Sequence, residues 1–182
     1  MNDRQREPGA SPGGGSDSIR PPEHGSFHVL FVCTGNTCRS PMAEVIGRAK
    51  VEARGWDGIE VRSAGAGAFP GSAAAGGAIR AAAGAGLDLT AHRATLLTRR
   101  EVEWADLILA MSSTHLMRAS ELGGGDRAFL LVAYAEDTQG SAATTSVPDP
   151  IGGTDGEYLE TYRRLDDLIE RVLDRLAPGV GR

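Results

Sequence analysis

The sequence is poor in cysteine, in aromatic residues and in long apolar runs. Its 182 residues include 2 cysteines, and aromatic residues make up 5% of the chain. Two cysteines do not make a disulfide framework, which fits a reducing cytoplasm. No apolar stretch approaches the ~20 residues that a membrane span needs, and the first residues lack the apolar core of a secretion signal. We therefore expect a cytoplasmic protein with no membrane partner.

An excess of positive charge is also missing. The chain has 19 Lys and Arg against 24 Asp and Glu, a net charge of -5 and a pI near 5.4, which argues against a nucleic-acid partner. Its length suits one domain with a real core and a spare segment. Residues 1–26 are rich in glycine, proline and charge, so we predict a disordered tail there and a single domain over residues 27–178.

One stretch stands out from the rest, V-L-F-V-C-T-G-N-T-C-R-S-P-M-A-E from Val29 to Glu44. Its four apolar residues predict a short buried strand that ends at Cys33. The polar residues that follow predict a tight loop, and Pro41 is expected at the first position of a helix, where its missing N–H costs nothing. The loop would then lie at a helix N-terminus, where free N–H groups and the helix dipole attract anions.

Cys33 and Arg39 would make such an anion site reactive. Five residues separate them, which is enough for a loop to curl around one tetrahedral oxyanion while the guanidinium holds two of its oxygens. The dipole and the arginine both favour the thiolate of Cys33, and a thiolate beneath a bound phosphate can attack phosphorus. A buried structural cysteine beside a surface arginine would explain the pair alone, but not the loop residues around it.

Strands and helices alternate along the rest of the chain. Predicted strands cover residues 29–32, 59–64, 105–111 and 128–132. Predicted helices cover residues 41–54, 73–85 and 157–176, another runs to about residue 122 from a cap at Ser112 or Ser113, and a short one starts at residue 99 behind a Thr98–Glu101 capping box. This alternation predicts an α/β fold with a parallel four-stranded sheet. Ligands of such sheets bind at the carboxyl ends of the strands, where the Cys33 loop begins.

The motif C-T-G-N-T-C-R-S-P-M-A-E resembles the phosphate-binding loop of the low-molecular-weight protein tyrosine phosphatases, most closely that of their bacterial protein-arginine-phosphatase branch. The resemblance implies a flavodoxin-like three-layer sandwich with helices on both faces of the sheet. It also implies a phosphatase that acts on a phosphorylated protein through a cysteinyl-phosphate intermediate and needs no cofactor. The oligomeric state stays open, with a monomer as the simplest expectation.

The same resemblance assigns roles to single residues. Asp149 in V-P-D-P-I-G-G, just before the final helix, matches the family's general acid, which also activates water as a base. Ser40 matches the hydroxyl that hydrogen-bonds the thiolate, and Asn36 the residue that holds the loop in a left-handed conformation. The remaining loop and support residues are Thr34, Gly35, Thr37, Cys38, Ser63 and His92. For Ser63 and His92, a strand-end serine and a surface histidine remain the alternative.

Cys38 and the histidines raise two further questions. In relatives, a second loop cysteine such as Cys38 can form a reversible disulfide with the nucleophile, while a small buried filler is the alternative. No metal site is predicted, because the histidines at positions 24, 28, 92 and 115 show no ligand spacing.

The substrate is predicted from Thr37, Ile151 and Phe69, which we place in the substrate pocket. Eukaryotic-type members of the family carry a bulky aliphatic residue at the position of Thr37 and an aromatic one at that of Ile151, both of which pack on a phosphotyrosine ring. Threonine is the residue of the arginine-phosphatase branch, so phosphoarginine is favoured over phosphotyrosine. An arsenate reductase on the same fold is an alternative, although no cysteine follows Cys38. A second alternative is a catalytically silent phosphoprotein-binding module. The intact catalytic residues Cys33, Arg39 and Asp149 argue against it.

Overall fold

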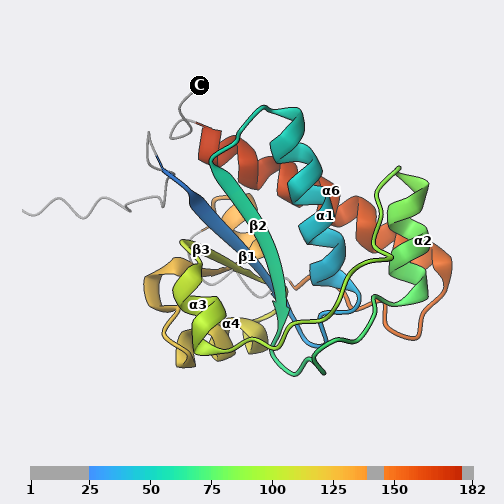
Figure 1. The fold of residues 1–182 in the computed structure, drawn as a ribbon, viewed down its shortest axis with the longest axis horizontal. Coiled ribbons are helices and arrows are strands. Elements are labelled where there is room, and N and C mark those ends of the chain that lie inside the picture. Colours follow the sequence, from blue (N-terminus) through green and yellow to red (C-terminus); the bar gives the residue numbers. More distant parts are fainter. Residues whose placement is uncertain (1–24, 139–145, 178–182) are drawn as a thin grey trace, which may run out of the picture.

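The computed structural model describes residues 25–138 and 146–177. In these residues a parallel four-stranded sheet has the order β2-β1-β3-β4 (Figure 1), with β1 at Phe27–Cys33, β2 at Ile59–Gly65, β3 at Leu107–Ala110 and β4 at Ala128–Leu130. This is the strand order of flavodoxin-like sheets, so the predicted fold is confirmed. Most of the predicted tail lies outside the described residues, and the domain boundaries stay predictions.

Helices cover both faces of the sheet, as Figure 1 shows. The described helices are α1 (Arg39–Ala53), α2 (Gly76–Gly84), α3 (Arg99–Trp104), α4 (Ser113–Glu121), α5 (Leu131–Ala135) and α6 (Asp155–Leu176), with a 3-10 turn at Gly125–Arg127. Helices α1, α2, α5 and α6 pack together on one face, and α3 and α4 lie on the other. None of the helices in this part of the chain has the length and apolar composition of a membrane span.

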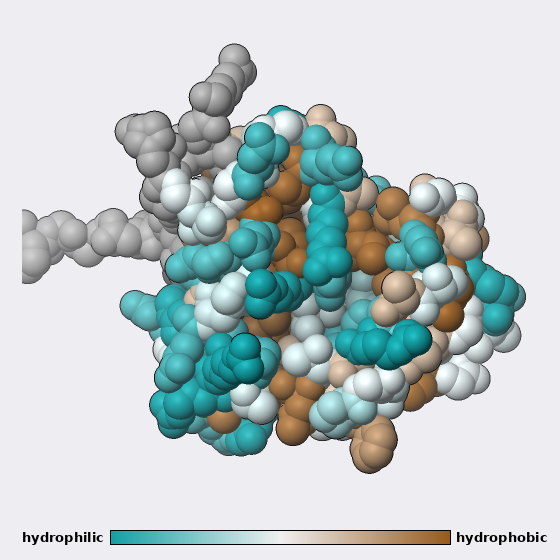
Figure 2. All heavy atoms as spheres, viewed as in Figure 1, coloured by the Kyte–Doolittle hydropathy of each residue, from teal (hydrophilic) through white to brown (hydrophobic). Residues whose placement is uncertain are grey.

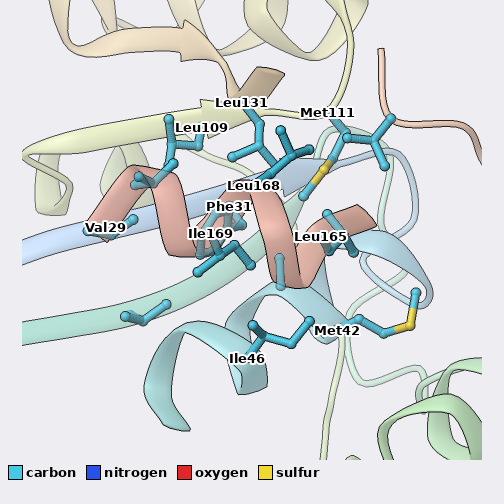
Figure 3. Close-up of a cluster of buried hydrophobic side chains, with 14 of the residues drawn as sticks. Val29, Phe31, Met42, Ile46, Leu109, Met111, Leu131, Leu165, Leu168 and Ile169 are labelled. Atoms are coloured by element: carbon cyan, nitrogen blue, oxygen red, sulfur yellow. The ribbon is translucent and has the colours of Figure 1, made fainter. Parts of the chain in front are cut away.

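The central strand β1 supplies side chains to two cores, because successive residues of a strand face opposite sides of the sheet. Val29 and Phe31 belong to the larger core, whereas Leu30 and Val32 belong to the smaller one beneath α3 and α4. Figure 3 shows the larger core, where β1, β3, α1, α5 and α6 contribute Val29, Phe31, Met42, Ile46, Leu109, Met111, Leu131, Leu165, Leu168 and Ile169. Apolar packing on both faces therefore anchors the strand that ends at Cys33.

The structure corrects several boundaries, among them the starts of α2 at Gly76 and of β3 at Leu107, which the sequence placed at residues 73 and 105. Helix α1 begins at Arg39, so Pro41 is its third residue and not its first. The proline is tolerated because the first four N–H groups of a helix have no intrahelical partner. The fourth strand ends at Leu130, and Leu131 begins a short helix that the apolar run F-L-L-V did not distinguish from strand. The final helix begins at Asp155, capped by Thr154.

Candidate active site

The Cys33 loop lies at the carboxyl ends of the central strands. The Cys33 carbonyl accepts a hydrogen bond from Ala66 N at 2.8 Å, and the Thr34 carbonyl accepts one from Gly67 N at 2.9 Å. This close approach requires glycine at position 65, where a Cβ atom would lie 2.6 Å from the Thr34 carbonyl oxygen. The loop is therefore fastened to the end of β2 as well as to β1 and α1.

Cys33 lies at the base of this loop, and only 2% of its surface is exposed. Its Sγ is 2.9 Å from the hydroxyl oxygen of Ser40, which is fully buried in the first turn of α1. A hydroxyl at this distance can donate a hydrogen bond to a thiolate, which stabilises the charged form of the sulfur.

Asn36 joins the loop to the residues behind it. It has a left-handed backbone, with φ at 53°, and is completely buried. Its Nδ2 donates to Ser40 Oγ and to Ser63 Oγ, both at 2.8 Å. Its Oδ1 accepts from Thr95 N at 2.8 Å, and its carbonyl oxygen accepts from His92 Nε2 at 2.8 Å. Ser63 and His92 thus lie in direct contact with the loop from two separate elements.

The Arg39 guanidinium is buried over the loop and only partly satisfied. Its Nη2 lies 2.5 Å from Asp149 Oδ2 and 3.3 Å from Thr34 Oγ1, and its Nη1 donates to the Val147 carbonyl at 3.1 Å. Its Nε is buried and has no hydrogen-bond partner among the described residues. An unpaired buried N–H costs about 1–3 kcal/mol, which a bound oxyanion would relieve. The site therefore brings Cys33, Arg39 and Asp149 together, and the N–H at Arg39 Nε is left to donate to an oxyanion.

His115 is a contact of this site that the sequence did not reveal. Its Nε2 lies 2.8 Å from Thr34 Oγ1, and its Nδ1 lies 2.9 Å from Ser112 Oγ. Burial, and then the charge of Arg39, lowers the pKa of His115 from 6.5 to about 4. The ring is therefore neutral at neutral pH, and Thr34 Oγ1 joins it to Arg39 by accepting a hydrogen bond from Arg39 Nη2. The available signal was its position just after β3, at the ligand-binding end of the sheet.

The three predicted pocket residues lie in the loop, in the segment after β2 and two residues after Asp149. Thr37 is half-buried, and its carbonyl accepts a hydrogen bond from Ala75 N at 2.8 Å. Ile151 is 68% exposed, and its N–H donates to Asp149 Oδ1 at 3.2 Å. Phe69 is 82% exposed in the segment after β2, where Gly67 bonds to the loop. The exposed side chains of Phe69 and Ile151 thus lie on segments that are hydrogen-bonded to the loop and to Asp149.

Cys38 packs away from solvent against α6. Its Sγ lies 3.4 Å from the hydroxyl of Tyr158, and both cysteines are free thiols. Burial, with the hydrogen bond to Cys38, raises the pKa of Tyr158 to about 12. The tyrosine ring fits because α2 carries Gly77, where a Cβ atom would lie 2.3 Å from the ring. Among the described residues, no group of three or more His, Cys, Asp or Glu could hold a metal ion.

Comparison with known proteins places this arrangement in a family. The family model described as "Low molecular weight phosphotyrosine protein phosphatase" matches residues 28–181. The protein-arginine-phosphatase of Geobacillus stearothermophilus is 38% identical over 153 residues, which cover 83% of this chain and 94% of the relative. The low molecular weight protein-tyrosine-phosphatase of Streptomyces coelicolor is 37% identical over 144 residues, 74% of this chain and 86% of the relative.

Solved structures give the same result. A YwlE arginine phosphatase mutant with a phosphorylated active site serine has a TM-score of 0.76 and 35% identity, over 83% of this chain and 96% of its own. The tyrosine phosphatase Wzb from Escherichia coli in complex with sulphate has a TM-score of 0.71 and 29% identity, over 82% of this chain and 97% of its own. The chain therefore belongs to the low molecular weight phosphotyrosine protein phosphatase family, and it is a protein phosphatase.

Proposed function

We propose that this phosphatase hydrolyses phosphoarginine in proteins through a cysteinyl-phosphate intermediate on Cys33. The observation that carries the mechanism is the buried, unpartnered Nε of Arg39, in a loop that begins with Cys33 and lies against Asp149. The phosphorylated active site serine of the YwlE mutant supports a covalent step at the corresponding position.

The reaction would take two steps. In the first, Cys33 Sγ attacks phosphorus, an S–P bond forms and the P–N bond breaks, while protonated Asp149 gives its proton to the leaving guanidine nitrogen. In the second, the Asp149 carboxylate takes a proton from water as the water oxygen bonds to phosphorus and the S–P bond breaks. Ser40, 2.9 Å from Sγ, stabilises the departing thiolate, and Arg39 holds the phosphoryl oxygens in both steps.

The preference for phosphoarginine rests on Thr37 and on the relatives. Neutral guanidine is a very poor leaving group, because the arginine pKa of about 12.5–13.8 exceeds that of a tyrosine hydroxyl, about 10. Asp149 must therefore keep the leaving nitrogen protonated. Thr37 offers a small polar wall in place of the aliphatic one that a flat ring would need. Two arginine phosphatases, at 38% and 37% identity, match the chain over 81% or more of its length.

Phosphotyrosine is the second candidate, and one observation favours it. Phe69 and Ile151 are both largely exposed on segments that bond to the loop or to Asp149, and such side chains can cover an aromatic ring. Relatives named as tyrosine phosphatases match most of the chain as well.

Turnover of phosphoarginine and phosphotyrosine peptides by the wild type and by Thr37→Ile distinguishes the two. We expect the wild type to have the higher kcat/KM for phosphoarginine. The substitution should raise phosphotyrosine turnover relative to phosphoarginine by an amount on the order of 1–3 kcal/mol. Thr138→Ile, at an exposed threonine outside the loop, is the control. An unchanged ratio removes Thr37 as the selector, and a wild-type preference for phosphotyrosine refutes the substrate assignment.

A further inference from the structure

A cavity of about 490 Å³ lies beside the edge strand β2, apart from the active site. Its walls come from β1, α1, β2, residues 88–95 and α3, and neither Cys33, Arg39 nor Asp149 lines it. Figure 2 views this face, with hydrophilic side chains gathered over α3 and β2 around apolar residues. The volume is in the range of roughly 300–1,000 Å³ that small-molecule pockets have.

The wall of this cavity is also the support of the catalytic loop. Ser63, His92 and Thr95 line the cavity, and each forms a 2.8 Å hydrogen bond with Asn36. Asn36 in turn donates to Ser40, whose Oγ lies 2.9 Å from Cys33 Sγ. An occupant that packs against these three residues would therefore press on the groups that hold the nucleophile's hydrogen-bond donor in place.

The positive charge of the wall is incompletely matched. The wall carries four arginines against three carboxylates. Arg48 pairs with Glu44 at 2.6 Å and Arg62 with Glu60 at 3.2 Å, whereas Asp88 and Glu101 accept hydrogen bonds from Thr90 and Thr98. The Arg93 guanidinium donates only to backbone carbonyls, and Arg100 has no side-chain partner among the described residues. The lining also includes the apolar side chains of Val45, Ala91 and Trp104. A ligand that suits the cavity therefore has an anionic group and an apolar body.

We propose that this cavity is a second ligand site for a small organic anion, and that its occupancy raises the activity at Cys33 through Asn36. The anionic group pairs with Arg93 and Arg100. The apolar body fills the cavity and holds Ser63, His92 and Thr95 against Asn36 in its left-handed conformation. Binding of the anion does not depend on the proposed function, whereas its effect on the rate rests on that function.

Binding is tested by NMR with benzoate, naphthoate and indole-3-carboxylate as probes. The chain has 2 tryptophans, so the indole N–H signal of Trp104 is assigned with Trp56→Phe. We expect the Trp104 signal to shift saturably with the carboxylates and not with benzyl alcohol, while the Trp56 signal stays in place. The double variant Arg93→Gln/Arg100→Gln should lose the shift. Arg99→Gln, an exposed neighbour that does not line the cavity, should keep it.

The coupling is tested by kcat/KM for 4-nitrophenyl phosphate and by the backbone amide signal of Asn36. A carboxylate that binds the catalytic loop would compete and lower kcat/KM, whereas one in the cavity should raise it several-fold, as allosteric couplings do. The rise and the Asn36 shift should both vanish in the double variant. Absence of a saturable Trp104 shift, or its persistence in the double variant, overturns the site. A purely competitive loss of rate, or an unmoved Asn36 signal at saturation, overturns the coupling. If the protein turns over no phosphate ester, the Trp104 and Asn36 signals still decide the proposal.

Discussion

Replacing Asn36 with alanine should damage both the stability and the activity of this phosphatase. The side chain is completely buried and contacts Ser40, Ser63 and the N–H of Thr95. In Asn36→Ala, the N–H of Thr95 loses its acceptor, and the loop keeps a positive φ that alanine resists.

The magnitude follows from these two losses. Leaving the N–H of Thr95 unpartnered costs about 1–3 kcal/mol, and holding alanine in the left-handed region costs roughly 1–2 kcal/mol. The two hydroxyls add little, because Ser63 still donates to Glu44 and Ser40 still reaches Cys33 and the Ala64 carbonyl. The free energy of unfolding should therefore fall by about 2–5 kcal/mol, a large part of the ~5–15 kcal/mol that domains have.

Urea unfolding measures this loss, and two further variants separate its causes. Asn36→Gly removes the backbone strain but not the lost acceptor, so it should recover about 1 kcal/mol relative to alanine. Asn36→Asp keeps an acceptor for Thr95 but no longer donates to Ser40. Because it buries a carboxylate with no lysine or arginine among its contacts, it should lose at least as much stability as the alanine variant, and it should also lose kcat/KM. An alanine variant within ~0.5 kcal/mol of the wild type would refute the reasoning, as would a glycine variant no more stable than alanine.

Two further predictions concern Asp149 and His115. Asp149→Ala should slow substrates with poor leaving groups far more than 4-nitrophenyl phosphate, and equal slowing across a leaving-group series would make Asp149 structural. For His115, a folded pKa of about 4 against 6.5 unfolded means that stability falls as the pH drops from 6.5 toward 4, because the unfolded chain then binds the proton more readily. Urea unfolding of the wild type should lose about 2 kcal/mol between pH 7 and pH 5 from this residue, and His115→Gln should lack that loss. The same drop in both proteins would contradict the assignment.

The sequence alone is sufficient to predict the Cys33 loop, because the conformation of this loop depends on residues that are neighbours in the chain. A strand is followed by Gly35, Asn36 and Pro41 within one short stretch. Each of these three residues has a backbone preference that indicates the local conformation by itself. The parallel four-stranded sheet followed from the alternation of strands and helices, whereas the flavodoxin-like fold came from the family resemblance. Asp149 and Thr37 came instead from the family resemblance, since neither D-P nor a threonine indicates chemistry by itself.

The rest depends on contacts between distant parts of the chain. His115 reaches Thr34 across 81 positions, and the Val147 carbonyl reaches Arg39 across 108, so no local pattern marks either contact. The boundary at Leu131 was missed because a short apolar run suits a buried strand and a buried helix equally. The cavity beside β2 is likewise invisible in the sequence, since its walls come from five separate segments.

The central claim is that Cys33 attacks phosphorus, and Cys33→Ser tests it most directly. Turnover of a phosphoarginine peptide and binding of inorganic phosphate are measured on the same preparation of this variant. The account predicts that turnover is abolished while phosphate still binds, because Arg39 and the loop amides remain in place. Turnover comparable to that of the wild type would contradict it.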